Sequence, residues 1–158
     1  MSEIKARLAQ LEDFPQLIAM VREFYVEDQI PYIAERVEPG LRTLLEQPSC
    51  GAALLMLDGD SVVGYITLGW CFSVEQGGRF VLLDELYLGP AARGRGWGRQ
   101  ALALARDWAA GQGAAVIRLE VNHHNAKAKS LYLSAGYRDD ERDILTLSLD
   151  GHSGRLHS

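Results

Sequence analysis

The chain has 158 residues, of which 47% are hydrophobic and 23% are charged. These fractions are close to the globular average, so they exclude a disordered chain and a fibrous rod. Sixteen Lys and Arg against 21 Asp and Glu give a net charge of -5, the wrong sign for a protein that binds nucleic acid through bulk charge. We therefore expect one compact domain over residues 1–150, a C-terminal tail over residues 151–158, and no nucleic-acid partner.

The distribution of charge argues against membrane insertion and secretion. The longest uncharged run, between Asp60 and Glu75, contains glycines, Ser and Thr and is shorter than the ~20 apolar residues of a membrane-spanning helix. Charges begin at Glu3, and no apolar signal core follows. We therefore expect a cytoplasmic protein without membrane contact. Cys50 and Cys71 lack metal-ligand spacing, and we expect both to be inert buried thiols.

The first half of the chain predicts one strand, two helices and a three-stranded meander. Residues 3–9 alternate polar and apolar side chains as a half-buried strand does. Two amphipathic helical segments follow, the second over residues 33–46. Turn sequences then separate three apolar, β-prone runs, which predicts antiparallel hairpins. These runs are residues 52–57, 62–74 and 80–88.

The second half predicts helices that alternate with strands. After a glycine-rich turn, residues 97–110 have the periodicity of a helix. The next strand, residues 115–121, is expected to run parallel to the third meander strand, because a strand–helix–strand connection of this length is a right-handed crossover. A short helix capped by Asn125 and a last strand over residues 144–149 follow. The predicted fold is an α/β (α+β) domain with a mixed, mostly antiparallel sheet, helices on both faces, and the order β-α-α-β-β-β-α-β-α-β.

A glycine-rich segment joins a predicted strand to a predicted helix and reads Arg93-Gly94-Arg95-Gly96-Trp97-Gly98. Glycines there allow backbone N–H groups to face a ligand at a helix N-terminus, where partial positive charge favours a phosphate. The segment is not a dinucleotide fingerprint, because Arg99 stands where the third glycine is required. No Gly-Lys-Ser/Thr follows to make a nucleoside-triphosphate loop. Spacing alone leaves a phosphate-binding loop and a solvated basic turn open.

At this segment the sequence resembles the GCN5-related N-acetyltransferases (GNAT family), whose signature is Gln or Arg, two residues, Gly, one residue, then Gly or Ala. Arg93, Gly96 and Gly98 match that signature. The order of elements, the strand before the motif and the helix from Asn125 to Tyr132 match as well, so the resemblance covers nearly the whole chain. It implies a GNAT-like fold and an enzyme that uses acetyl-CoA.

The resemblance also implies a place for the cofactor. The glycine-rich loop would hold the pyrophosphate of acetyl-CoA, and pantetheine would bond to the backbone of the preceding strand near Leu86 and Leu88. Asn125 and Lys129 would complete this site. The implied cofactor-binding residues are Leu86, Tyr87, Leu88, Arg93, Gly94, Arg95, Gly96, Trp97, Gly98, Asn125 and Lys129.

Tyr132 occupies the position where the family commonly places a tyrosine that protonates the departing thiolate. A phenol with a reference pKa near ~10 keeps its proton at neutral pH and can donate it. Tyr132 also falls on the apolar stripe of its own helix. Packing alone is therefore the alternative explanation.

Two adjacent acids, Asp84 and Glu85, lie on the strand before the loop, so they are expected to point to opposite faces and not to form a carboxylate pair. Strict alternation places Asp84 on the face of Leu82, Leu86 and Leu88, and Glu85 on the face of Leu83 and Tyr87. The chain resembles polyamine acetyltransferases here, in which the first acid of an adjacent pair relays the amine proton. We expect Asp84 as the catalytic base ahead of Glu85, with a structural salt bridge as the alternative.

Acidic and aromatic residues border the regions where this family binds the acceptor. Tyr25, Glu27 and Glu75 are expected to contact a cationic amine. A solvated helix end explains the same charges equally well. His123 and His124 have no partner at metal-ligand spacing, so no metal is expected.

Together these expectations describe an acetyl-CoA-dependent N-acetyltransferase. The primary amine of a small cationic acceptor would attack the thioester directly, and acetyl-CoA would be a cosubstrate. A homodimer is expected because it is common in the family. The alternatives are a non-catalytic acyl-CoA-binding or regulatory domain and an acetyltransferase of protein or peptide amines, and the sequence does not name the acceptor.

Overall fold

The computed structural model describes residues 3–150. Within them one five-stranded sheet has the order β1-β2-β3-β4-β5, with β4 and β5 parallel and the other pairs antiparallel. The strands are β1 (Lys5–Leu8), β2 (Gly51–Asp58), β3 (Ser61–Ser73), β4 (Gly78–Leu88) and β5 (Ile117–Leu119). The helices are α1 (Phe14–Glu27), α2 (Ala34–Glu46), α3 (Trp97–Gly111) and α4 (Ala126–Ser134), with 3-10 turns at Leu11–Asp13 and Pro90–Ala92. The predicted fold class is confirmed, and the expected tail over residues 151–158 lies outside the described residues.

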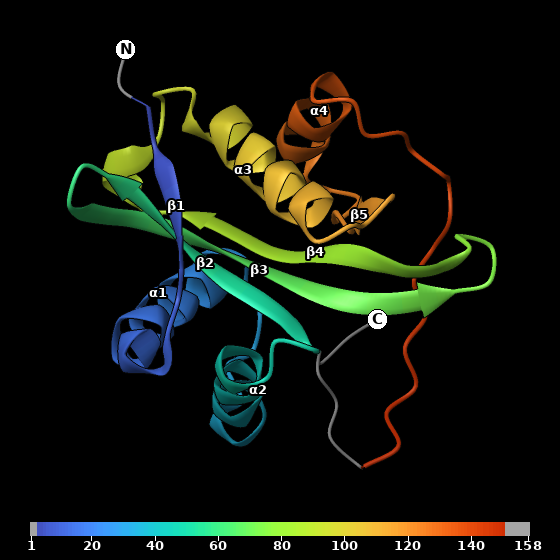
Figure 1. Cartoon of the computed structure of the whole chain (residues 1–158), viewed down its shortest axis with the longest axis horizontal. Coiled ribbons are helices and arrows are strands. Elements are labelled where there is room, and N and C mark those ends of the chain that lie inside the picture. The colour runs from blue at the N-terminus through green and yellow to red at the C-terminus, as the bar shows by residue number, and fades with distance from the viewer. Residues whose placement is uncertain (1–2, 151–158) are drawn as a thin grey trace.

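Helices cover both faces of the sheet, with α1 and α2 on one face and α3 and α4 on the other (Figure 1). Each face has its own apolar core. Trp97 and Ala101 of α3 pack with Ile66 on one side, and Leu17 of α1 packs with Tyr65 on the other. A sheet with two apolar faces requires such a cover on each side.

The predicted hairpin between β2 and β3 is confirmed. Asp58 pairs with Ser61, so two residues form the turn, and Gly59 adopts a positive φ of 60°. Primed two-residue turns require this left-handed conformation, which glycine adopts without strain.

β4 contains one residue more than the stretch of β3 that it pairs with. Thr67 is the Cα partner of Glu85, but the next β3 residue, Leu68, is the partner of Leu83. Asp84 is therefore the extra residue of a β-bulge.

The bulge shifts the alternation of side chains along β4, so the expected faces were partly wrong. Leu83 and Leu86 both pack in the core beneath α3, although they are three residues apart. Glu85 shares the α1 face with Tyr87, as expected, but not with Leu83. Strict alternation counted Asp84 as a regular strand residue, and this is the physical reason for the error.

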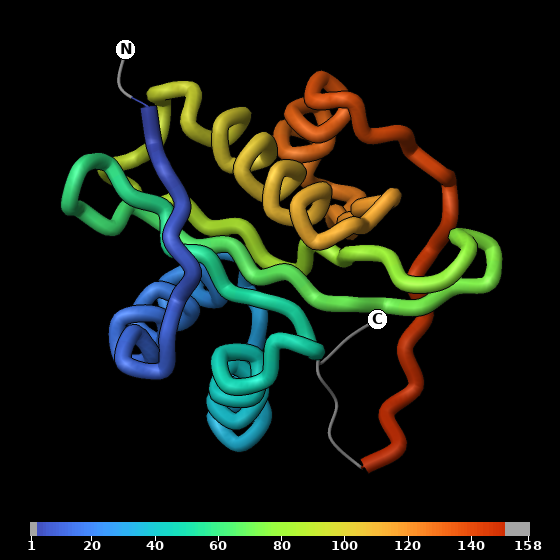
Figure 2. Tube along the Cα trace, in the orientation of Figure 1, coloured from blue at the N-terminus to red at the C-terminus, as the bar shows by residue number. Residues whose placement is uncertain are grey.

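The last expected strand is not formed. Residues 144–149 belong to no strand or helix, and their four large apolar side chains are 60% to 92% exposed. Residues 138–150 leave α4, run past the end of the β3–β4 hairpin and end on the α2 side of the sheet (Figure 2). Apolar alternation identifies a segment suited to a strand, but it does not supply the neighbouring strand that the segment needs.

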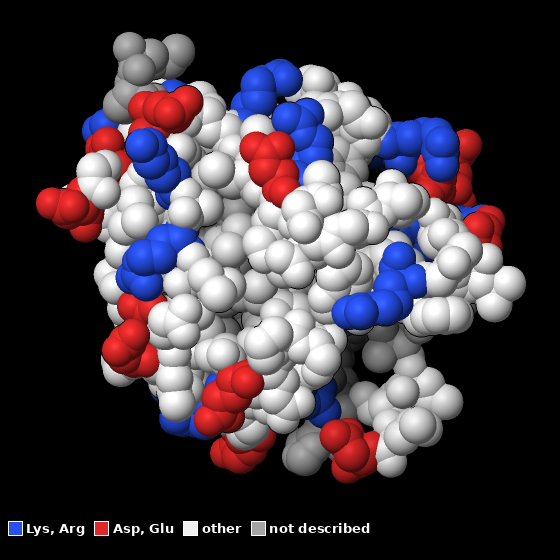
Figure 3. All heavy atoms as spheres, in the orientation of Figure 1, with Lys and Arg blue, Asp and Glu red and all other residues white. Residues whose placement is uncertain are grey.

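The surface carries charges of both signs. On the face drawn in Figure 3, acidic and basic side chains are interspersed and form no large patch of one sign. No helix within residues 3–150 is long and apolar enough to cross a membrane. Cys50 is exposed and Cys71 is half-buried, so the expectation of two buried thiols was wrong for Cys50.

Candidate active site

The main feature of the site is an opening between two parallel strands. β4 and β5 pair only where Val81–Leu83 meets Ile117–Leu119, whereas β4 continues to Leu88. Beyond Leu83, no strand of the described residues covers the β5 side of β4. The two strands therefore diverge, and one edge of β4 is left open for a ligand.

The backbone of Leu86 and Leu88 points into this opening. The N–H of Gly89 donates to Val63 of β3 at 2.9 Å. Successive strand residues direct their backbone groups to opposite sides, so Leu86 and Leu88 direct theirs away from β3. The carbonyl of Leu88 accepts a bond from Arg93 Nε at 3.1 Å, and the bulge leaves the groups of Leu86 facing the gap.

The glycine-rich loop follows directly on the open edge of β4. Gly94 and Gly96 have positive φ angles of 74° and 75°, which L residues adopt only with strain. Gly96 is also the N-cap of α3 and has no side chain to cap the first-turn N–H groups. The loop thus combines a tight backbone turn with the positive end of a 15-residue helix, a combination that suits an anion.

The arginines of the loop have different partners. Arg93 donates to Glu27 at 2.6 Å, so the expected acceptor-binding residue Glu27 is joined to the loop. Arg99 donates to the hydroxyl and the carbonyl of Ser134 and thereby fastens α3 to α4. Arg95 lies 4.9 Å above the ring of the buried Trp97. The positive charge beside the loop therefore comes from three arginine side chains, each of which is held by a contact within the protein.

Gly98 has a packing role. A Cβ atom at this position would lie 3.1 Å from Cδ2 of Leu131 on α4. That separation is tighter than ordinary van der Waals contact, so glycine lets α4 approach the first turn of α3 closely.

Glu85 is held by two tyrosine hydroxyls on the α1 face. Tyr25 donates to one of its carboxylate oxygens at 2.5 Å and Tyr65 to the other at 2.8 Å. Burial raises the pKa of Glu85, while the two hydrogen bonds oppose that rise. Burial and the charge of Glu85 also raise the pKa of both tyrosines, which keeps them protonated as donors. Glu85 therefore has the contacts of a structural acid.

Glu85→Ala is expected to lower the free energy of unfolding, because it leaves the hydroxyls of Tyr25 and Tyr65 without their acceptor. Tyr65 is fully buried, and a buried donor without a partner costs roughly 1–3 kcal/mol. Thermal melts of Glu85→Ala and Glu85→Gln would measure this, since the amide oxygen of Gln can still accept one bond. An unchanged melting temperature in Glu85→Ala would contradict a structural role.

Asp84 and Glu120 lie together where β4 and β5 separate. Leu83 and Leu119 form the last pair of the parallel ladder, and the two acids are the residues that follow them. The residues around Asp84 displace part of the water that would hydrate its carboxylate, and this raises its pKa although the residue is solvent-exposed. Partial burial raises the pKa of Glu120, and the charge of Asp84 raises it further. Sequence analysis did not select Glu120, because its proximity to Asp84 follows only from the strand register.

Tyr132 lies on α4 with its ring half-buried. Its ring centroid is 6.2 Å from that of Tyr137, in an edge-to-face arrangement. Burial raises the pKa of Tyr132, and the charge of Asp28 at the end of α1 raises it further. The phenol therefore stays protonated well above neutral pH, as a proton donor must.

The other expected site residues have structural partners. Asn125 caps α4 by accepting from the N–H of Ala128 at 3.2 Å. Lys129 pairs with Asp139 at 2.6 Å.

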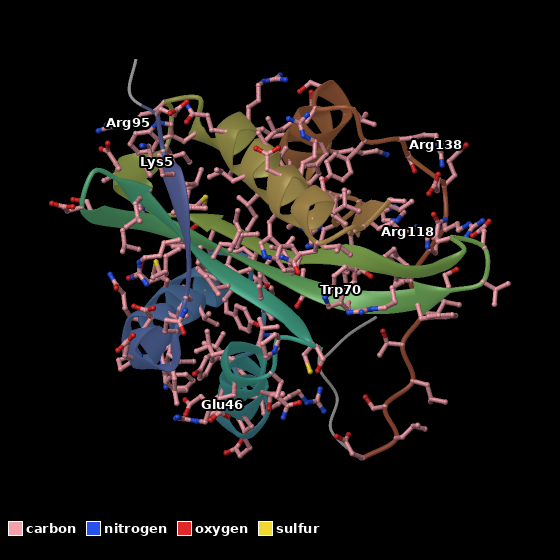
Figure 4. The ribbon with its side chains drawn as sticks, viewed as in Figure 1. Lys5, Glu46, Trp70, Arg95, Arg118 and Arg138 are labelled. Carbon is pink, nitrogen blue, oxygen red and sulfur yellow. The ribbon has the colours of Figure 1, made fainter. Side chains whose placement is uncertain are left out.

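Glu75 lies at the opposite end of β4 from the glycine-rich loop. It pairs with Arg142 at 3.0 Å and with Arg118 at 3.5 Å. Figure 4 shows Arg118 and the loop residue Arg95 at opposite ends of the molecule. The structure therefore does not bring Glu75 together with Asp84 and the loop.

Titratable side chains form no metal centre in the part of the chain that the structure describes, since no group of three or more His, Cys, Asp and Glu is placed to hold an ion. His123 is instead 3.3 Å from Asp143.

Residues 15–137 match the acetyltransferase (GNAT) family. The chain belongs to the GNAT family. Three relatives of the chain carry N-acetyltransferase names, and we conclude that this GNAT protein is an acetyltransferase. They are the N-acetyltransferase YhfO of Bacillus subtilis (30% identical; 86% of this chain and 89% of the relative), a mouse thialysine N-epsilon-acetyltransferase (28%; 98% and 97%) and an aminoalkylphosphonate N-acetyltransferase of Salmonella typhimurium (30%; 84% and 83%).

A solved structure supports the GNAT fold. An integron cassette protein from the mobile metagenome of Cole Harbour Salt Marsh superposes with a TM-score of 0.80. It is 28% identical, and the match covers 95% of this chain and 93% of that one. The GNAT family uses acetyl-CoA.

Proposed function

We propose that this GNAT protein transfers an acetyl group from acetyl-CoA to a primary amine of a small cationic acceptor by direct attack. The observation that carries the proposal is the opening between β4 and β5. Its open strand edge leads to an anion-suited helix N-terminus, and its apex carries the carboxylates of Asp84 and Glu120.

In this proposal the cofactor follows the open edge of β4. The backbone of Gly94 to Gly98 would bind the pyrophosphate, and Leu86 would hydrogen-bond the pantetheine amides through the N–H and C=O that it directs away from β3. Tyr87, buried under α1, and Leu88, which packs in the core beneath α3, would shape this edge from the two faces of the sheet. Asn125 would act by capping the start of α4, and Lys129 by joining this helix to Asp139 beyond its end.

The proposed chemistry uses two proton transfers. The acceptor ammonium must lose a proton before its nitrogen can attack the thioester, and Asp84 or a water bound to it would take that proton. Tyr132 would donate a proton to the departing thiolate. No covalent enzyme intermediate is needed, because the amine itself is the nucleophile.

The charge around the opening favours a cationic acceptor. The charge of Asp28 acts on Tyr132, and the charge of Asp84 acts on both Tyr25 and Glu120. Beside Glu85, the hydroxyl of Thr67 is buried without a hydrogen-bond partner within the described residues, so it could bind a ligand or a water. The names of the mouse and Salmonella relatives also refer to small molecules that carry an amine.

Turnover tests the proposal. Free-thiol release from acetyl-CoA would be followed with polyamines, amino acids, aminoalkylphosphonates, aminoglycosides and peptide N-termini as acceptors. We expect the highest kcat/KM with a small amine that carries a further positive charge. A non-catalytic acyl-CoA-binding domain would bind acetyl-CoA but release no thiol with any acceptor, and preference for peptides would favour a protein acetyltransferase.

Gly96→Glu is expected to weaken acetyl-CoA binding at least ~10-fold, because it adds a negative charge where backbone N–H groups would face the pyrophosphate. Any L residue at position 96 is strained by the φ of 75°. Gly96→Ala is the matched control, since it carries that strain without the charge. Calorimetric titration that gives both variants the same affinity would show that charge is not the cause.

Cytoplasmic location and a homodimer remain predictions for this protein. They are compatible with the proposed reaction, which needs only acetyl-CoA and a small amine.

A further inference from the structure

The side chain of Arg93, at the start of the glycine-rich loop, turns back toward the strand that precedes the loop. Its Nε donates to the carbonyl of Leu88 at 3.1 Å, and its guanidinium carbon lies 5.9 Å from the ring centroid of Tyr87. Both partners are the last residues of β4. Arg93 therefore holds the start of the loop against the end of β4.

Two acids of α1 receive this arginine and this tyrosine. Nη2 of Arg93 donates to Glu27 at 2.6 Å, and the hydroxyl of Tyr87 donates to Glu23 at 2.9 Å. Glu23 and Glu27 are four residues apart, so they lie on one face of the helix. The contacts of Arg93 with Leu88, Tyr87 and Glu27 are here called the Arg93 anchor.

Tyr87 is the buried part of this anchor. It is only 3% exposed, and burial together with the hydrogen bond to Glu23 raises the pKa of its phenol to about 12. The phenol therefore keeps its proton and remains a donor to Glu23 at neutral pH. The ring that Arg93 contacts is thus itself held in place by α1.

The glycine-rich loop is short, and both of its ends are attached to the rest of the protein. At the far end, Trp97 is buried in the core beneath α3. Only Gly94, Arg95 and Gly96 lie between Trp97 and the Arg93 anchor. Because glycine restricts the backbone least, the position of this segment depends on its two attachments.

We propose that Glu27 is a positioning residue for the cofactor loop. Acting through Arg93, it fixes the first end of the loop so that the backbone N–H groups after it face the pyrophosphate of acetyl-CoA. Arg93 is then an anchor and not a direct ligand of the phosphates, and Glu27 serves the cofactor and not the acceptor. The inference rests on the proposed function, in which this loop binds acetyl-CoA.

Charge alone predicts the opposite effect of Glu27. Because the phosphates of the cofactor are anionic, removal of a nearby acid would strengthen their binding through space. Loss of the anchor would weaken it. The side chains of Arg93 and Glu27 are 47% and 40% exposed, so water screens their attraction and the effect should be moderate. We expect Glu27→Ala to weaken acetyl-CoA binding about 5-fold in calorimetric titration.

Glu23→Gln is the matched control. It removes a negative charge from the same face of α1, but the amide oxygen of Gln can still accept the bond from Tyr87. The affinity of this variant for acetyl-CoA should be higher than that of the wild type or within about twofold of it. Circular dichroism would check that both variants fold.

A double-mutant cycle separates an anchor from a direct ligand. If Arg93 acts through Glu27, Arg93→Ala should weaken acetyl-CoA binding in the wild type and have little further effect in Glu27→Ala. A side chain that binds the phosphates directly would instead contribute to affinity in both backgrounds.

A thioester without phosphates localises the effect to the loop. Values of kcat/KM would be measured with acetyl-CoA and with S-acetyl-N-acetylcysteamine, which lacks the pyrophosphate. Glu27→Ala should lower kcat/KM for acetyl-CoA alone. An equal loss with both thioesters would indicate general damage to the site and would overturn the proposal.

Gly96→Glu distinguishes failure of this inference from failure of the proposed function. Weaker acetyl-CoA binding in Gly96→Glu, with unchanged or tighter binding in Glu27→Ala, would overturn the role of Glu27 and retain the loop as the cofactor site. Unchanged binding in both variants would overturn both proposals. A loss of affinity in Arg93→Ala that persists in full in Glu27→Ala would make Arg93 a direct ligand and also overturn the inference.

Discussion

Tyr132→Phe is expected to lower kcat by ~10² to 10⁴-fold while the affinity for acetyl-CoA stays within about threefold of wild type. The substitution removes only the hydroxyl and keeps the ring that contacts Tyr137. Burial and the charge of Asp28 raise the pKa of this phenol, so it retains the proton that the thiolate needs. Stopped-flow or steady-state thiol release, together with calorimetric titration of acetyl-CoA, measures both quantities.

Tyr137→Phe provides the control. The hydroxyl of Tyr137 is buried and has no hydrogen-bond partner within residues 3–150, so its removal should leave kcat unchanged and the melting temperature equal or higher. If Tyr132→Phe changes kcat less than about threefold at an unchanged melting temperature, the residue serves packing alone.

Asp84→Asn is expected to lower kcat/KM by ~10²-fold or more at neutral pH, because the acceptor ammonium loses its proton acceptor. In the wild type, kcat/KM should rise as pH passes the raised pKa of Asp84, since only the carboxylate can take a proton. The difference in kcat/KM between Asp84→Asn and the wild type should become smaller at high pH, where more of the acceptor amine is already neutral in solution. A pH–rate profile from about pH 5 to 10 measures these differences.

The stability of Asp84→Asn should change in the opposite direction to its activity. A carboxyl whose pKa is higher in the folded state stabilises the fold when protonated, and that contribution is lost as pH rises through the folded pKa. At neutral pH the wild type therefore carries a charge that folding disfavours. The amide variant should melt at the same or a higher temperature at pH 7, and this difference should disappear below about pH 4.

Parallel substitutions identify which acid takes the proton. Glu120→Gln should reduce kcat/KM less than Asp84→Asn does, and Glu85→Gln should reduce it least, because tyrosines already occupy both oxygens of Glu85. A larger loss of kcat/KM in Glu120→Gln than in Asp84→Asn would identify Glu120, next to β5, as the base. A larger loss in Glu85→Gln would identify Glu85, on the α1 face, as the base.

Most elements of the fold could be predicted because their signals are local. The helix of residues 97–111 follows from its periodicity and from Gly96 before it, and the β2–β3 hairpin follows from the Asp-Gly turn. Family resemblance led us to expect pantetheine at the backbone near Leu86, and the register of β4 with β5 leaves that edge open within the described residues.

The details of the site that were missed depend on register and distance. No local signal distinguishes a bulge at Asp84 from a regular strand residue, so the face of Leu83 was assigned wrongly. Glu120 is 36 positions from Asp84 in the sequence and meets it only through strand pairing. Glu75 was expected near the acceptor because its region borders the acceptor pocket in this family; its ion pairs with Arg118 and Arg142, which lie far from it in the sequence, could not be predicted from composition.

The bulge in β4 separates the sequence changes open to Asp84, the proposed catalytic base, from those open to the core. Because Asp84 is an added residue, the side chains on either side of it keep the faces that an uninterrupted strand would give them. Deleting Asp84 would leave Leu83, Glu85 and Leu86 in phase with their present neighbours. A carboxylate could thus enter the middle of an apolar strand as an insertion, without replacing any buried side chain, and a lineage could lose it by a single codon deletion and still fold.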